Sequence, residues 1–286
     1  MLKFILPTGS LADAVRSYLT QAGYCVPQPD RRGFCGMSNG VEFHQLDRRT
    51  VPAFLATGKY HAGITGRDLW VASEVQGLRE VCALSFSRGS EKPTRWVLAQ
   101  NVDVSFASDY VRRIGCELPT FARKILGDRE FRYEIVQISG SEEQCVRDGL
   151  VDMVVVMTES GSSLKANGLE IVQRCESLFE STPVILANPD LPEEESALLS
   201  AVSASLRAVV GAKKRVMIAC NLPSSVGVTQ LQLPAEISPT ICPLADASWV
   251  SCTVCVPIEK QGEVIVQLEK QEARGIVIQN VQGFVP

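Results

Sequence analysis

The chain has 286 residues, of which 45% are apolar and 21% charged, and its formal net charge is −4. This length and apolar content predict two compact domains, with room for a small third. The acidic balance argues against the broad basic face that is typical of nucleic-acid-binding proteins. We therefore expect no nucleic-acid partner, although a local anion site is compatible with a negative net charge.

Neither a targeting segment nor a membrane span is predicted. The first ten residues, from Met1 to Ser10, hold one lysine and a short apolar run that is far from a signal-peptide core. No segment approaches the ~20 consecutive apolar residues that a membrane helix needs. We expect a cytoplasmic protein with no membrane partner.

The cysteines do not form a recognisable metal or disulfide pattern. There are ten of them, and only Cys252 and Cys255 have CxxC spacing, within the apolar run Trp249–Ile258. The chain has only two histidines, His44 and His61, so no zinc set can be completed from the spacing. The sequence predicts reduced, mostly buried thiols and no metal ligands.

The first predicted elements are a strand over Leu2–Leu6, a turn over Pro7–Ser10 and a helix from Leu11 that stops at Gly23. A glycine turn between a strand and a helix directs backbone N–H groups toward the start of the helix, which can bind an anion. Most such turns only connect two elements, and both interpretations stay open.

Strands and helices then alternate, which predicts an α/β fold with right-handed crossovers. The predicted helices are Val51–Thr57, Arg67–Val75, Thr120–Leu126, Glu142–Gly149 and Glu193–Val210. The predicted strands are Tyr60–Gly66, Trp96–Gln100, Val111–Ile114, Tyr133–Ile138, Leu150–Met157, Leu169–Cys175 and Thr182–Ala187. The almost wholly apolar run Leu150–Met157 favours a strand that is buried on both faces of a parallel sheet.

The pattern changes after Gly211, where a small α+β module of about 70 residues is predicted. Its expected strands are Val216–Cys220, Ala247–Ile258 and Gly275–Val281, and its expected helix is Gly262–Gln271. The change in pattern at 211–215 is therefore the clearest domain boundary.

The most informative segment follows the Leu150–Met157 strand. It places Glu159, Ser160, Gly161, Ser162 and Ser163 in a loop where the strand ends. Hydroxyl residues around a glycine supply N–H and O–H donors with little bulk, which suits a phosphate at the carboxyl end of a sheet strand. An ordinary serine-rich turn that caps a helix has the same composition, so spacing alone does not decide between the two.

This segment resembles the phosphoribosyl pyrophosphate motif of long-form ATP phosphoribosyltransferases. An apolar strand with an acid leads into a Glu-Thr-Gly-x-Thr-Leu loop, and Ala-Asn-Gly-Leu follows. The matching residues are Asp152, Glu159, Gly161, Leu164 and Ala166 to Leu169, with Ser160 and Ser163 as hydroxyl substitutes. Other resembling segments, in chain order, are Leu6–Leu11, Gly63–Asp68, Gly140–Glu143, Ser238–Leu244 and Ala273–Ile278.

The resemblance implies two α/β lobes like those of periplasmic binding proteins, with a cleft between them, and a C-terminal ferredoxin-like (ACT-like) α+β domain. We expect lobe I at 1–95 and 176–212, lobe II at 96–175 and the regulatory domain at 213–286. The implied reaction transfers a phosphoribosyl group from phosphoribosyl pyrophosphate to N1 of ATP, with Mg²⁺, as the first step of histidine biosynthesis. Histidine as an allosteric inhibitor and a homo-oligomer, dimer or hexamer, are implied as well.

The resemblance also assigns site residues. The donor would be bound by Asp152 and by the loop of Glu159, Ser160, Gly161, Ser162 and Ser163. The acceptor nucleotide would be bound by Thr8, Gly9, Ser10, Leu11, Thr65, Gly66 and Glu143. No catalytic side chain is assigned, because a displacement of this kind depends mainly on positioning and charge neutralisation.

Several charged positions of the family differ in this chain. Thr8 and Ser10 stand where the family has a lysine and an arginine, and His61 and Val156 stand where it has acids. Before Pro52 the charges of Asp47, Arg48 and Arg49 are out of the family's order. Substitute cations can come from Arg67, Arg88, Lys92 and Arg95, or these can be exposed surface residues.

Three functions therefore stay open. The chain is an ATP phosphoribosyltransferase with an altered site, a phosphoribosyltransferase with another acceptor, or a non-catalytic ligand-binding or regulatory paralogue of the same fold.

Overall fold

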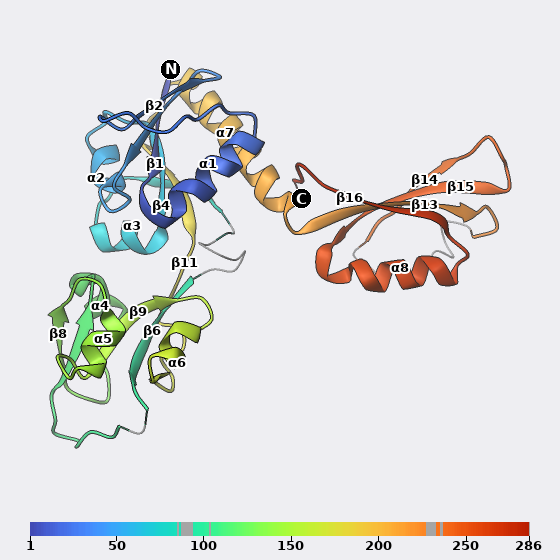
Figure 1. Cartoon of the computed structure of the whole chain (residues 1–286). Helices are drawn as coiled ribbons and strands as arrows, with labels where there is room; N and C mark the ends of the chain where they lie inside the picture. The colour runs from blue at the N-terminus through green and yellow to red at the C-terminus, as the bar shows by residue number, and fades with distance from the viewer. Residues whose placement is uncertain (85, 87–93, 103, 227–232, 235–236, 286) are drawn as a thin grey trace. The chain divides into compact units, whose positions relative to one another are not determined.

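The computed structural model describes residues 1–84, 86, 94–102, 104–226, 233–234 and 237–285. The chain divides into two compact units (Figure 1). Residues 1–17 and 25–200 form the first unit, and residues 18–24 and 201–286 form the second. The first unit holds two sheets and the second holds one. The lobe boundaries expected near 95, 175 and 212 stay predictions.

The first sheet has the order β2-β3-β1-β4-β12-β5. Its strands are β1 (Leu2–Pro7), β2 (Phe34–Ser38), β3 (Val41–Leu46), β4 (Ala62–Gly66), β5 (Arg79–Ala83) and β12 (Pro183–Ala187). Strand β1 runs parallel to both β3 and β4, whereas β12 is antiparallel to β4 and β5. The parallel strands β1, β3 and β4 therefore end at the same edge of the sheet, and the loops that follow them are neighbours.

The helices of the first sheet are η1 (Gly9–Leu11), α1 (Ala12–Gln21), α2 (Val51–Ala56) and α3 (Arg67–Ser73). Helix α2 buries Val51 and Leu55 against Ile5 of β1 and against β12. Gly63 of β4 is required by close packing, because a methyl group there would lie 2.9 Å from Cβ of Ile5. This close contact holds β4 against β1 beside the edge where their loops emerge.

The second sheet has the order β10-β6-β9-β7-β8, and β11 pairs with the beginning of β6. Its strands are β6 (Thr94–Asn101), β7 (Arg112–Cys116), β8 (Tyr133–Gln137), β9 (Met153–Thr158), β10 (Leu169–Ile171) and β11 (Phe179–Ser181). Its helices are α4 (Pro119–Leu126), α5 (Glu142–Arg147) and α6 (Ser162–Ala166). The chain enters this sheet through β6 and returns to the first sheet from β11 to β12.

Strand β9 was expected to be buried on both faces of a parallel sheet, and the structure places it in a mixed sheet. It is parallel to β7 but antiparallel to β6, because β6 is the strand that brings the chain over from the first sheet. Its first half is buried, and its second half, from Val156 to Thr158, is only partly buried. The partly buried half approaches the cavity described below.

The second unit has an antiparallel sheet in the order β14-β15-β13-β16. The strands are β13 (Arg215–Pro223), β14 (Thr240–Pro243), β15 (Trp249–Pro257) and β16 (Arg274–Asn280), with η2 (Ile258–Lys260) and helix α8 (Gln261–Lys270) before β16. Helix α8 buries Val264 and Leu268 against one face of the sheet. Long crossovers from β13 to β14 and from β15 to β16 with this strand order give the predicted ferredoxin-like fold.

The remaining helix, α7 (Glu193–Ala212), begins with three glutamates, as its sequence predicts. Among the helices of the described chain, none is both long and apolar enough to cross a membrane. All ten cysteines are free thiols; five of them are buried, whereas Cys25 and Cys242 are exposed.

Candidate functional site

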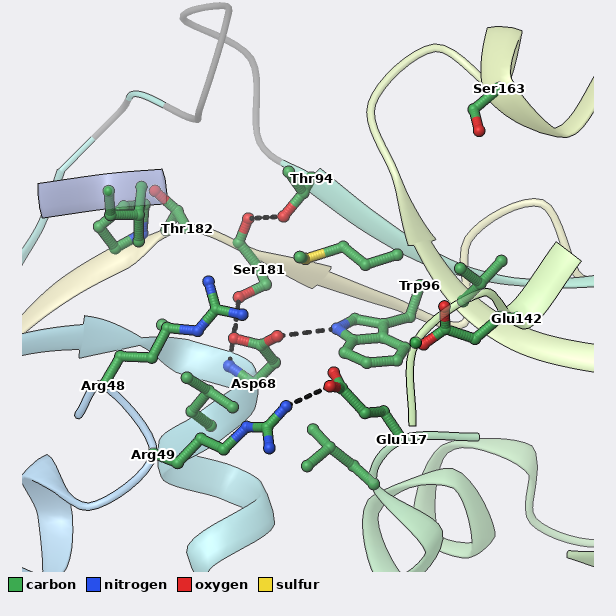
Figure 2. A pocket seen from close by; sticks show the side chains of 18 of the residues that line it. Arg48, Arg49, Asp68, Thr94, Trp96, Glu117, Glu142, Ser163, Ser181 and Thr182 are labelled. Atoms are coloured by element: carbon green, nitrogen blue, oxygen red, sulfur yellow. Dashed lines mark hydrogen bonds and ion pairs between the residues drawn. The ribbon is translucent and has the colours of Figure 1, made fainter. Parts of the chain in front are cut away.

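A cavity of about 460 Å³ lies within the first unit, where the ends of the two sheets meet (Figure 2). A volume of this size suits a nucleotide-sized ligand. The lining residues from the first sheet and its loops are Leu11, Arg48, Arg49, Gly66, Asp68, Leu69, Phe86, Thr182 and Pro183. Those from the second sheet are Thr94, Trp96, Glu117, Leu118, Gly140, Glu142, Glu143, Val156, Met157, Ser163 and Ser181.

The predicted phosphate loop follows β9 and folds as a tight turn. Gly161 has a φ of +77°, and its N–H donates to Oγ1 of Thr158 at 2.9 Å. The N–H of Ser162 donates to Oγ of Ser160 at 3.3 Å, and the hydroxyls of Ser160 and Ser162 are 2.9 Å apart. Part of the donor set that was expected to face a phosphate is thus used inside the turn.

Ser163 is the loop residue that lines the cavity. Its hydroxyl donates to Oε1 of Glu143 at 2.9 Å, which ties the start of α6 to α5. Gly140, Glu142 and Glu143 line the same wall, so the Gly140–Glu143 segment and the loop, far apart in sequence, form one surface. Ser160 and Ser162 are exposed. Neither these two serines nor Glu159 and Gly161 are among the residues that line the cavity.

The Gly63–Asp68 segment forms the junction between the sheets. Asp68 is only 5% exposed, and its carboxylate accepts hydrogen bonds from Ser181 Oγ at 2.7 Å and Trp96 Nε1 at 3.0 Å (Figure 2). Ser181 in turn accepts from the N–H of Asp68 at 3.2 Å. Gly66 leaves room for this carboxylate, because a methyl group at Gly66 would lie 2.3 Å from Oδ1 of Asp68. Asp68 therefore holds α3 against the strands through which the chain passes between sheets.

Two arginines that the sequence did not assign to the site line the cavity. Arg48 and Arg49 follow β3, and Arg49 forms an ion pair with Glu117, which follows β7 of the second sheet (Figure 2). The carbonyl of Arg48 accepts a hydrogen bond from Oγ1 of Thr65 at 2.7 Å. The predicted site residue Thr65 is fully buried, so its structural role here is to fix the backbone of Arg48.

The turn after β1 lies beside Arg48. Of the predicted acceptor residues, Leu11 and Gly66 line the cavity with Glu143, whereas Thr8, Gly9 and Thr65 do not. The side chain of Ser10 lies outside the described part of the chain. Gly9 has a φ of +79°, and a methyl group built on it would lie 3.8 Å from Nη1 of Arg48. The first turn is thus at the rim of the cavity, next to a cation from another loop.

Asp152 is separated from the loop, contrary to the expectation. It precedes β9 and the loop follows β9, so about 20 Å of strand lies between them. Its carboxylate accepts from the N–H of Arg113 at 2.7 Å and from the Tyr110 hydroxyl at 3.1 Å. Burial alone would raise the pKa of Asp152, but the hydrogen bonds together have the larger effect and lower it. Asp152 is a structural residue at the far end of the strand.

The other altered positions fall into two groups. His61 precedes β4, at the opposite end from Gly66, and its Nδ1 accepts the N–H of Lys3 at 3.0 Å. Burial lowers the pKa of His61. Val156, by contrast, lines the cavity beside Met157, so the wall is apolar where the family has an acid. The change at His61 is remote from the cavity, and the change at Val156 is within it.

The candidate substitute cations do not reach the cavity in the described chain. Arg67 forms an ion pair with Glu80, with Nε and Oε2 3.2 Å apart. Arg95 is in β6, opposite Thr158 of β9, and is not among the lining residues. Arg88 and Lys92 lie outside the described residues.

No group of three or more His, Cys, Asp or Glu side chains in the described chain is arranged to hold a metal ion. The cavity does contain four carboxylates, from Asp68, Glu117, Glu142 and Glu143. Asp68 and Glu117 are engaged by the partners described above. Glu142 and Glu143 fit a Mg²⁺ ion that is bound mostly by substrate phosphates and takes one or two ligands from the protein.

The chain matches a family model described as ATP phosphoribosyltransferase over residues 48–208. A second model, described as HisG, C-terminal domain, matches residues 212–283. A relative from Geotalea uraniireducens, named ATP phosphoribosyltransferase, is 32% identical over 97% of this chain and 96% of its own. ATP phosphoribosyltransferase 1 of Geobacter sulfurreducens is 31% identical over the same shares.

A similar fold occurs in a solved structure, the ATP phosphoribosyl transferase (HisG:HisZ) complex from Thermotoga maritima. The TM-score is 0.61 at 23% identity, and the match covers 72% of this chain and 98% of that one. At this level of identity the likeness shows a shared fold.

Proposed function

We propose that this chain, which belongs to the ATP phosphoribosyltransferase family, joins the phosphoribosyl group of phosphoribosyl pyrophosphate to N1 of ATP and releases pyrophosphate. The members of this family are transferases that act at the first step of histidine biosynthesis.

The observation that carries the proposal is the composition of the cavity where the two sheets meet. Its second-sheet wall joins Ser163 of the loop to Gly140 and Glu143, and its first-sheet wall holds Gly66 and Leu11. Four separate segments that resemble the family thus contribute to one cavity. This agreement supports binding of donor and acceptor in the same place.

The chemistry requires little from the side chains beyond placement. The bond between the anomeric carbon and the pyrophosphate oxygen breaks, and a bond to N1 forms. N1 of adenine attacks through a lone pair, so no base has to remove a proton first. The apolar surface of Trp96, Met157, Leu69 and Leu118 suits a purine ring, and the polar wall of Glu143 and Ser163 suits a sugar phosphate. Positioning and charge neutralisation then account for catalysis.

Mg²⁺ belongs to this proposal as the ion that the substrates bring with them. When bound, it would neutralise charge on the leaving pyrophosphate. Glu142 and Glu143 are the residues that fit it, since Mg²⁺ in phosphate-transfer sites takes only one or two carboxylates. The excess of carboxylates over arginines in the lining also favours a metal-complexed polyphosphate over a bare one.

The test is release of pyrophosphate by the purified chain in the presence of donor, ATP and Mg²⁺. We expect release only when all three are present, and we expect EDTA to abolish it. Release with another purine or heterocycle but not with ATP would replace the acceptor in the proposal. No release with any acceptor, while the donor still raises the melting temperature, would favour a binding protein instead.

We also propose that the second unit regulates the enzyme by binding histidine, and that the enzyme is a dimer or hexamer. The match to the C-terminal domain model supports the first part. Within this unit a depression of about 560 Å³ is lined by residues that include Lys270 and Glu272, charges that suit an amino acid. Calorimetric titration with L-histidine tests the first part, and light scattering tests the second. No heat of binding, or a monomer, would contradict the respective part.

A further inference from the structure

The position of Arg48 follows from the pairing of two parallel strands. Pro7 of β1 lies opposite Leu46 of β3, and the N–H of Thr8 donates to the carbonyl of Leu46 at 3.0 Å. The turn after β1 and the loop after β3 therefore leave the sheet side by side. This places Nη1 of Arg48 3.8 Å from the position of a methyl group on Gly9, between Thr8 and Ser10 in sequence.

The surroundings of Arg48 leave its charge available. Among the cavity-lining residues of the described chain, Arg49 is held by Glu117 and Asp68 is held by Trp96 and Ser181. Within the same described residues, the guanidinium of Arg48 has no hydrogen-bond acceptor or ion-pair partner. Its backbone, in contrast, is fixed by the hydrogen bond from Thr65 to its carbonyl. A fixed backbone and an uncommitted guanidinium at a cavity rim are features of an anion-binding arginine.

We propose that Arg48 binds the pyrophosphate or polyphosphate group of the substrates at the turn after β1. It does so in place of basic side chains that Thr8 and Ser10 do not provide. The guanidinium can donate two parallel hydrogen bonds to phosphate oxygens, which a lysine of the turn could not do. The identity of the ligand rests on the proposed function, whereas the anion site itself rests on the geometry. Arg49 has a different role, because its ion pair with Glu117 joins the two sheets.

Binding of inorganic pyrophosphate with Mg²⁺, measured by calorimetry on the full chain, tests the proposal without any need for turnover. We expect Arg48→Gln to weaken binding by about tenfold to a hundredfold, the loss of one or two charged hydrogen bonds. Arg48→Lys keeps the charge but not the two parallel hydrogen bonds, so it should lose less binding than Arg48→Gln. Arg79→Gln removes an exposed charge of the same sheet outside the cavity, and it should leave binding unchanged.

A second variant tests the place of the site. In the Arg48→Gln background, Thr8→Lys puts a cation back on the turn itself, and we expect it to recover at least part of the lost binding. A purely structural role of Arg48 would not be rescued in this way. Circular dichroism and the urea midpoint check that each variant is folded.

The outcomes separate this proposal from the proposed function. Unchanged binding in Arg48→Gln, an equal loss in Arg79→Gln, no recovery with Thr8→Lys, or no binding by the unmodified chain would each overturn the role of Arg48. If instead Arg48→Gln loses pyrophosphate binding but the unmodified chain makes no product with ATP, the anion site stands and the acceptor assignment fails.

Discussion

The packing of Gly66 against the carboxylate of Asp68, at the junction between the two sheets, can be tested by its effect on the free energy of unfolding. In Gly66→Ala the new methyl group would lie 2.3 Å from Oδ1 of Asp68, so the carboxylate must turn away from Ser181 and Trp96. Those are buried hydrogen bonds to a charged group, each worth roughly 1.5–3 kcal/mol. We therefore expect Gly66→Ala to lower the free energy of unfolding of the first unit by about 2–4 kcal/mol.

Asp68→Ala should cost about 3–5 kcal/mol, since it leaves the Trp96 and Ser181 donors without their acceptor. Once Asp68 is an alanine, however, the next atom near the new methyl at position 66 is Oγ of Ser181 at 3.7 Å, an ordinary contact. The backbone of Gly66, with φ −73° and ψ 141°, also accepts alanine without strain. In that background Gly66→Ala should cost less than about 1 kcal/mol and can even stabilise the chain.

The assay is urea unfolding of the two single variants and the double variant, all in a Trp249→Phe background. The remaining tryptophans, Trp70 and Trp96, are then both in the first unit and report on it alone. We expect a coupling free energy of about 1–3 kcal/mol between positions 66 and 68. Additive effects, or a Gly66→Ala variant as stable as the unmodified chain, would refute this account of the junction.

Three further predictions concern the loop, the far end of β9 and the thiols. Gly161→Val forces a residue with φ +77° to carry a side chain 3.5 Å from Ile171, inside the loop that leads to Ser163, and should raise the KM for the donor at least about tenfold. Gly168→Val is similarly strained, with φ +74°, but follows α6 and is outside the loop, so it should not raise the KM; equal KM values would contradict the loop assignment. Asp152→Asn should destabilise the chain by about 1–3 kcal/mol at neutral pH. The pKa of Asp152 is lowered in the folded chain, so its stabilising contribution is present above the unfolded pKa and is lost as the pH falls through the folded pKa. If Asp152→Asn is still less stable than the unmodified chain in acid, this role of Asp152 is wrong. Burial raises the pKa of Cys116 to about 11, so near pH 8 iodoacetamide should label the exposed Cys25 well before Cys116, as mapped by mass spectrometry; equal labelling rates would contradict the burial.

Much of the fold could be predicted from the spacing of apolar residues and from turn residues in the sequence. The helices at Val51–Ala56, Arg67–Ser73 and Glu193–Ala212 and the apolar strand Met153–Thr158 were all expected from periodicity and turn residues. A small α+β unit was expected from the change of pattern after Gly211, and the resemblance to the family implied its ferredoxin-like fold. These elements are predictable because their apolar residues repeat at the spacing of the structure that buries them.

The arginines of the cavity were missed because the strands before them were missed. Val41, Phe43 and the polar residues between them alternate, and Asn39-Gly40 is a common two-residue hairpin turn, with φ +51° and +79° in the structure. This signal predicts the β2–β3 hairpin, and β3 then delivers Arg48 to the same edge as the turn after β1. The position of Arg48 beside this turn depends on β3 being the neighbour of β1 in the sheet, and local sequence patterns do not determine which strands are neighbours.

The misplacement of Asp152 has a similar cause. Asp152 and Glu159 flank one strand, and the resemblance to the family placed both of them at the donor site. An extended strand instead carries its two ends apart by about 3.3 Å per residue, so only the residues after β9 reach the cavity.

The most direct test of the central claim is mass spectrometry of the product that the purified chain makes from ATP, phosphoribosyl pyrophosphate and Mg²⁺, with pyrophosphatase present to draw the reaction forward. We expect a new species equal to ATP plus one phosphoribosyl group, attached at N1 of the adenine. ATP and donor recovered unchanged, under conditions in which the donor still binds, would contradict it.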